Sequence, residues 1–131
     1  MIEYIKHKGD IISIIIKSNY VDENIKFFTP ESFELQLGYM NRKKNYRIKP
    51  HMHSATKRNI LKTFEVLFIR KGKVQIDYFD KNKIKLQSKI LNKGDTILIG
   101  DCGHGFIMLE DSEILEVKQG PYQIDKDKYP I

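Results

Sequence analysis

The sequence has few of the features that mark a disulfide-rich, membrane-spanning or secreted protein. Its single cysteine, Cys102, cannot form an internal disulfide, which fits a reducing compartment. The longest apolar run near the start, 11–16, is far too short to span a bilayer, and it lacks the small-residue cleavage site of a signal peptide. We therefore expect a soluble, cytoplasmic protein with no membrane association.

Arginine is also scarce. Only four of the 23 basic residues are arginine, although the formal net charge is +6. The planar guanidinium group is the usual ligand for phosphates and bases, and no recurring pattern of aromatic and basic residues is present. We interpret the charge as a solvated basic surface, so nucleic acid is not an expected partner, although a pI near 9.3 would ordinarily suggest one.

No segment has a convincing helical stripe, and short strands take its place. Apolar residues recur with a period of two between turn signals, which is the strand signature. A length of 131 residues, 40% of them hydrophobic, fits one domain with its own core. We expect an all-β antiparallel sandwich or barrel. The predicted strands are 11–16, 32–40, 46–53, 64–69, 74–79, 84–90, 96–99, 106–109 and 113–118.

Histidines and one carboxylate form a candidate metal site. His51 and His53 lie two residues apart, so on a strand they point to the same face and can chelate a divalent metal. His104 lies between two glycines, which leave room for it to turn toward a cavity. Glu65 stands in an apolar strand, where a carboxylate is costly unless it is paired or metal-bound. Three imidazoles and one carboxylate suit Fe, Mn, Co, Ni, Cu or Zn.

Each of these residues also has an ordinary structural explanation. A histidine pair on a strand is more often exposed than ligating when it stands alone. Glu65 could pair with Arg47, Arg58 or Arg70, and His104 could bond to the backbone in a turn. The coincidence of all these features in one chain favours the metal site.

The same residues resemble the two motifs of the cupins, small proteins with a double-stranded β-helix, or jelly-roll, barrel. The first motif has His-x-His, then Glu, six residues and Gly, and the second runs from Gly-Asp to a later His. The matching residues are His51, His53, Glu65 and Gly72, and then Gly94, Asp95 and His104. Eleven residues separate His53 from Glu65, more than the family usually has.

The resemblance covers roughly residues 35–118 and implies a single cupin domain over 1–131. The N-terminal strands would lie within 1–34, and 119–131 would be a short polar tail. It also implies that the four ligands hold a divalent transition metal inside the barrel, with the substrate entering through the open mouth. The stretch 103–122 is similar to small cupins found with surface-polysaccharide and nucleotide-sugar genes.

The function implied is binding or conversion of a small oxygen-rich molecule, such as a sugar or sugar phosphate, in polysaccharide biosynthesis. The metal would act as a Lewis acid in isomerisation or epimerisation. Candidates for gripping a phosphate or carboxylate are Arg47, Arg58 and Arg70. A non-catalytic binding or sensor protein and a metal-dependent dioxygenase are the alternatives, so whether the chain is an enzyme stays open.

Three further expectations concern the acid–base groups, the cysteine and self-association. Without a metal, a histidine and a tyrosine could perform acid–base chemistry, and Cys102 is interpreted as a structural thiol. A homodimer is expected because edge strands of small barrels often pair with a second copy. The strand at 11–16 is the expected contributor, since its apolar faces suggest a cover from beyond its own barrel. The candidate tyrosines are Tyr39, Tyr46, Tyr78 and Tyr122.

Overall fold

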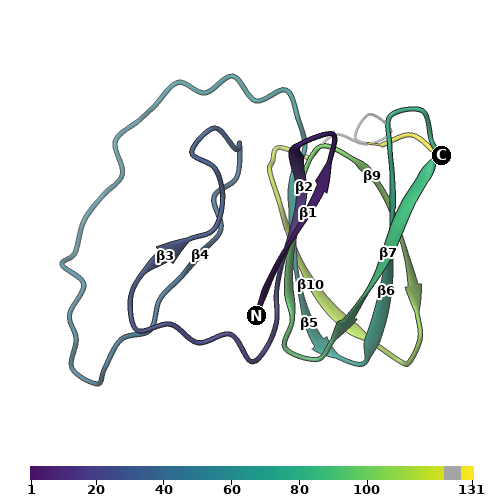
Figure 1. The fold of residues 1–131 in the computed structure, drawn as a ribbon. Coiled ribbons are helices and arrows are strands. Elements are labelled where there is room, and N and C mark those ends of the chain that lie inside the picture. The colour runs from purple at the N-terminus through teal and green to yellow at the C-terminus, as the bar shows by residue number, and fades with distance from the viewer. Residues whose placement is uncertain (123–127) are drawn as a thin grey trace.

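A computed structural model describes residues 1–122 and 128–131 (Figure 1). All strand pairs are antiparallel, which confirms the all-β class. Within these residues no helix is long and apolar enough to cross a membrane. The strands are β1 (Ile2–His7), β2 (Asp10–Ile16), β3 (Lys26–Phe27), β4 (Gly38–Tyr39), β5 (Glu65–Lys71), β6 (Lys73–Phe79), β7 (Lys85–Asn92), β8 (Thr96–Ile99), β9 (Gly103–Met108) and β10 (Glu113–Lys118).

Two sheets pack face to face as a sandwich (Figure 1). One has five strands in the order β1-β2-β8-β5-β10, and the other has three in the order β7-β6-β9. From β5 onward the chain crosses between the sheets four times. The first crossing is at Gly72, whose φ of +91° lets the chain reverse direction between β5 and β6. The main core between the sheets consists of Ile5, Ile12, Ile15, Leu67, Ile69, Val74, Ile76, Tyr78, Leu91, Ile97 and Ile99.

A buried hydrogen-bond chain joins the two sheets inside this core. The Tyr78 hydroxyl donates to Ser13 Oγ at 2.9 Å, and the Ser13 hydroxyl donates to the Leu98 carbonyl at 2.7 Å. Tyr78 and Ser13 are both fully buried, and burial raises the pKa of Tyr78. Tyr78 is therefore a neutral structural residue.

Tyr78→Phe should lower the free energy of unfolding by about 1 kcal/mol, because Ser13 loses its buried donor while the ring still fills the core. Urea denaturation followed by circular dichroism would measure the change. Tyr122→Phe is the control, since Tyr122 is 73% exposed. Equal stability of the two variants would contradict a stabilising role for the Tyr78 hydroxyl.

A second apolar cluster covers the outer face of the five-stranded sheet. Ile14 and Ile16 of β2 and Leu98 of β8 face outward and meet Phe28 and Phe64. Residues 20–39, including the β3–β4 hairpin, supply most of the surrounding apolar side chains. β2 also lies between β1 and β8. The outer face of 11–16 is therefore covered from outside the two packed sheets, but by residues 20–39 of the same chain and not by a second copy, and β2 is not an edge strand.

Two predicted strands are largely missing. Of 32–40 only β4 at Gly38–Tyr39 is a strand, and 46–53 contains none. Residues 41–63 instead form an irregular and almost fully exposed stretch, the long loop at the left of Figure 1. This stretch, which we term the basic segment, holds eight lysines and arginines and no acidic residue. Repulsion between like charges disfavours the packing that a strand would need.

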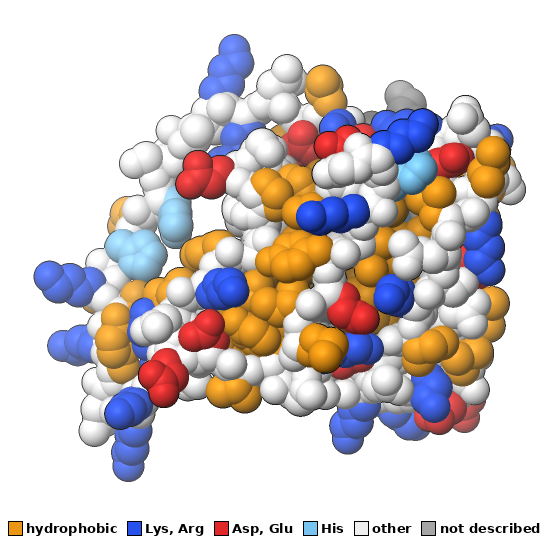
Figure 2. Space-filling view, in the orientation of Figure 1, with side chains coloured by type: hydrophobic (Ala, Val, Ile, Leu, Met, Phe, Trp, Pro, Cys, Tyr) orange, Lys and Arg blue, Asp and Glu red, His pale blue; other side chains and the backbone are white. Residues whose placement is uncertain are grey.

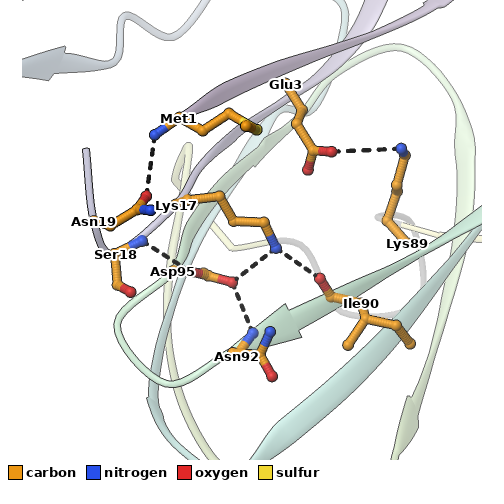
Figure 3. Close-up of polar contacts among 9 residues, drawn as sticks. All are labelled: Met1, Glu3, Lys17, Ser18, Asn19, Lys89, Ile90, Asn92 and Asp95. Atoms are coloured by element: carbon orange, nitrogen blue, oxygen red, sulfur yellow. Dashed lines mark hydrogen bonds and ion pairs between the residues drawn. The ribbon is translucent and has the colours of Figure 1, made fainter.

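The turn between β7 and β8 is fixed by a buried carboxylate (Figure 3). Asp95, only 2% exposed, accepts hydrogen bonds from the backbone N–H groups of Ser18 at 2.9 Å and Asn92 at 2.7 Å. The Lys17 ammonium lies 3.2 Å from its second oxygen and also donates to the Ile90 carbonyl at 3.0 Å. Asp95 thus ties the end of β2 to the β7–β8 turn.

Candidate functional site

A cavity of about 790 Å³ opens at one end of the sandwich, where β5, β9 and β10 meet. The C-terminal residues 128–131 form part of its wall. Its apolar lining includes Leu67, Phe106 and Ile114. Its polar lining includes Glu65, Lys81, Asp101, His104, Glu116 and Lys118.

Two of the predicted ligands face each other in this cavity. Glu65 begins β5 opposite the buried Ile99, and His104 on β9 lies opposite the buried Tyr78, so the register turns both side chains inward. Glu65 Oε1 lies 3.7 Å from His104 Nε2, and the side chains are 17% and 26% exposed. Glu65 therefore lies beside an imidazole from the opposite sheet.

Burial controls the protonation of His104. It lowers the pKa of the imidazole, against the opposing effects of a backbone hydrogen bond at Cys102 and of the Glu116 carboxylate. A neutral imidazole near pH 7 keeps a lone pair that can accept a proton or bind a metal. The site therefore places a proton acceptor beside a carboxylate in a partly dry cavity.

His104 should make metal-free protein less stable in mild acid. Because its pKa is lower in the folded chain than in the unfolded chain, the unfolded state binds more protons, and stability falls as the pH drops below about 6.5. Urea unfolding between pH 8 and pH 5 in the presence of a chelator would measure this slope. His104→Asn should flatten it, whereas the exposed control His53→Asn should not. Equal slopes in all three proteins would contradict the assignment.

The other two predicted ligands lie apart from this cavity. His51 and His53 are exposed on the basic segment with ring centroids 5.2 Å apart, and His51 Nδ1 lies 2.7 Å from the Lys49 carbonyl. The argument that they share a strand face is wrong, because no strand forms there. In the described part of the chain no three His, Cys, Asp or Glu side chains gather as a metal site. The structure thus places the four predicted ligands as two separate pairs, His51 with His53 and Glu65 with His104.

The three arginines considered for ligand binding do not line this cavity. Arg47 and Arg58 are exposed on the basic segment, and Arg70 is exposed on β5. Their role in binding stays a prediction. Among the candidate tyrosines, Tyr39 packs in the outer cluster and Tyr78 in the main core.

Sequence reasoning missed several groups that do line the cavity. Glu116 and Lys118 face inward on β10, beside Leu67 and Glu65 of β5. They follow the core-packed Ile114 at intervals of two residues, and residues two apart share a strand face. This spacing is the sequence signal that could have identified them. Tyr129 also lines the cavity, although none of the four candidate tyrosines does.

Cys102 packs against the main core at the rim of the cavity. Its thiol lies 3.7 Å from the Ile12 carbonyl, and burial raises its pKa to about 12. Such a thiol is not a nucleophile near neutral pH, in agreement with the structural interpretation.

Comparison of the chain with protein families, curated proteins and solved structures gives no match.

Proposed function

We propose that the open end of the sandwich binds a small oxygen-rich molecule, such as a sugar or sugar phosphate. The observation that carries this proposal is the Glu65–His104 pair, 3.7 Å apart in a cavity of about 790 Å³. Small-molecule sites are concave and mostly apolar, with a few converging polar groups. Glu65 and Glu116 can accept hydrogen bonds from hydroxyl groups, while the Lys118 ammonium can bind a phosphate or carboxylate.

We further propose that the fold is the cupin type of double-stranded β-helix. Strands β8-β5-β10 face β7-β6-β9, and the chain crosses repeatedly between the two sets. That order supports a jelly roll, in which two sheets share one double-wound path. The fold alone assigns no reaction, so the functional argument depends on the site.

The Glu65–His104 pair also supports proton transfer within a bound sugar, as in an isomerase or epimerase. Neutral His104 can take a proton from a carbon next to a carbonyl group. The carboxylate of Glu65 would stabilise the imidazolium that forms, and the proton would then return to the product. Binding without turnover is the second candidate, since the same cavity would hold a ligand in either case.

The divalent transition metal expected at His51, His53, Glu65 and His104 does not fit the residues as they are arranged. Only Glu65 and His104 share a site, and catalytic metal sites commonly use three protein ligands. We therefore assign no chemical step to a metal. Metal binding, and with it the dioxygenase alternative, would require His51 and His53 to reach Glu65 and His104.

A binding and exchange experiment tests the proposal. Isothermal titration calorimetry with a panel of sugar phosphates and nucleotide sugars should find saturable binding. Glu65→Gln and His104→Asn should weaken that binding at least tenfold, whereas Glu110→Gln, outside the cavity, should not. Deuterium uptake from D₂O into the bound sugar would indicate proton transfer, and its absence would indicate a binding protein. Binding unaffected by both site variants would overturn the proposed site.

A further inference from the structure

The basic segment, residues 41–63, gathers positive charge on one exposed stretch of chain. We propose that it binds single-stranded nucleic acid, with its cationic side chains on the phosphates and its exposed rings stacked on the bases. The interpretation of the charge as a solvated surface considered the chain as a whole, whereas the structure presents these groups together. The proposal is independent of the sugar-binding cavity, whose lining, among the described residues, includes none of the cationic groups of the segment.

Most cationic groups of the segment have no carboxylate partner. In the part of the chain that the structure describes, only Lys62 of the eight forms an ion pair, with Asp101 at 3.3 Å. Outside the segment 17 acidic residues face 15 basic ones, so the rest of the chain has a net charge of −2. Figure 2 shows blue side chains projecting along the left margin, where Figure 1 places the segment. The charge is therefore one-sided and available to an external anion.

The segment also holds most of the arginines. Three of the four lie here, with Arg47 and Arg58 exposed and Arg42 half-buried. A guanidinium group can donate two parallel hydrogen bonds to one phosphate, which an ammonium group cannot do. The few arginines of the chain are thus concentrated where phosphate groups could reach them.

Exposed rings accompany these charges. Tyr46 is 56% exposed, and the Arg42 guanidinium lies over its ring at 4.5 Å from the centroid. His51 and His53 are exposed as well, with ring centroids 5.2 Å apart. Unpaired bases stack on aromatic rings and on guanidinium planes, whereas a run of carboxylates offers no such faces. The rings therefore favour a nucleic acid over an acidic protein.

The irregular backbone favours a single strand over a duplex or a membrane. Residues 41–63, all of them described, contain no helix or strand, and these are the elements that enter the major groove of a duplex. Insertion into a bilayer would leave the backbone N–H and C=O groups of the segment without partners. A single strand exposes its bases and can follow an extended stretch of chain.

Fluorescence anisotropy tests the binding. A fluorescein-labelled single-stranded DNA of mixed sequence, about 20 nucleotides long, would be titrated with full-length protein. We expect saturable binding that weakens about 10²- to 10³-fold between 50 and 200 mM salt, because about five to seven phosphate contacts would each release counterions. Failure to bind at the lower salt concentration would overturn the proposal.

Two sets of charge-neutralising variants locate the site. Arg42→Gln, Lys43→Gln and Lys44→Gln together should weaken binding at least tenfold at the lower salt concentration and make the salt dependence shallower. The same change at three exposed lysines outside the segment should do neither. Equal weakening by both sets would mean that net charge alone holds the strand, and would overturn the assignment to the segment. The control lysines are Lys6, Lys71 and Lys93.

Base stacking is tested separately from charge. Tyr46→Ala should weaken binding roughly tenfold without changing its salt dependence, and Tyr46→Phe should bind like the wild type. An abasic oligomer with the same number of phosphates should bind at least tenfold more weakly than the DNA strand. Equal affinity for the abasic oligomer would indicate a general polyanion site and overturn the proposal.

A duplex and vesicles distinguish the other partners. At the higher salt concentration, where charge contributes least, a duplex of the same sequence should bind more weakly than the single strand. Vesicles that contain phosphatidylserine should bind weakly in cosedimentation and release the protein to the strand, since they offer charge without bases. Tighter binding of the duplex, or vesicle binding that the strand does not displace, would overturn the proposal.

Discussion

Asp95→Ala should lower the free energy of unfolding by about 3–5 kcal/mol. The carboxylate is 2% exposed and accepts from two backbone N–H groups while it pairs with Lys17. Its removal would leave those N–H groups without their acceptor and leave the ammonium uncompensated. Because Lys17 remains 24% exposed, water can partly solvate it, which favours the lower end of the range.

Urea unfolding at pH 7 would measure this loss, with Glu23→Ala as an exposed control. Asp95→Asn should fall between the wild type and the alanine variant, since an amide oxygen can still accept one backbone hydrogen bond. A loss below about 1 kcal/mol for Asp95→Ala would show that the β7–β8 turn tolerates the missing carboxylate.

Phe64→Ala should also cost about 3–5 kcal/mol, because the ring is 3% exposed and its removal opens a cavity in the outer cluster. Phe64 packs against Phe33 and ends the basic segment, so its loss should also free residues 20–39 from the sheet. Hydrogen exchange should therefore speed up in the β3–β4 hairpin, while β6 stays protected.

Leu61→Ala is the matched control, since Leu61 lies three residues away and is 84% exposed. It should leave stability and hydrogen exchange unchanged. Uniformly faster exchange in β6 and the hairpin of Phe64→Ala would contradict a locally acting anchor and indicate one cooperative unit.

The strands that the sequence predicts well are those with a clear burial pattern. In β6 the buried residues Val74, Ile76 and Tyr78 alternate with partly exposed ones, so the period of two identifies the strand and its inner face. β2 and β8 are similarly dense in buried aliphatic residues. For such strands the local pattern and the final packing agree.

The prediction failed where a strand needed a partner that the sequence pattern cannot specify. Tyr46 and Ile48 alternate with charged residues like a half-buried strand, yet both are exposed and unpaired in the ladder. Strand pairing is non-local, and a pattern of two apolar residues does not determine which edge, if any, it joins. Because no strand forms at 46–53, His51 and His53 do not share a strand face as predicted.

The candidate site was predictable only in part. The carboxylate of Glu65 in an apolar strand and the glycine-flanked His104 each signalled an inward polar group, and the structure places them 3.7 Å apart. Glu116 and Lys118 share the strand parity of the apolar Ile114, but they were missed because charged residues near the end of a strand do not by themselves indicate an inward face.

The concentration of positive charge in one exposed stretch has a consequence for proteolysis. Trypsin cuts after lysine and arginine in exposed, irregular chain, and the basic segment offers both the residues and the conformation. Cleavage after Arg42 and after Lys62 would release seven of its eight cationic groups and leave a body with 17 carboxylates and 16 basic side chains. Brief digestion would thus convert a protein with a pI near 9.3 into an acidic particle that no longer binds a cation exchanger.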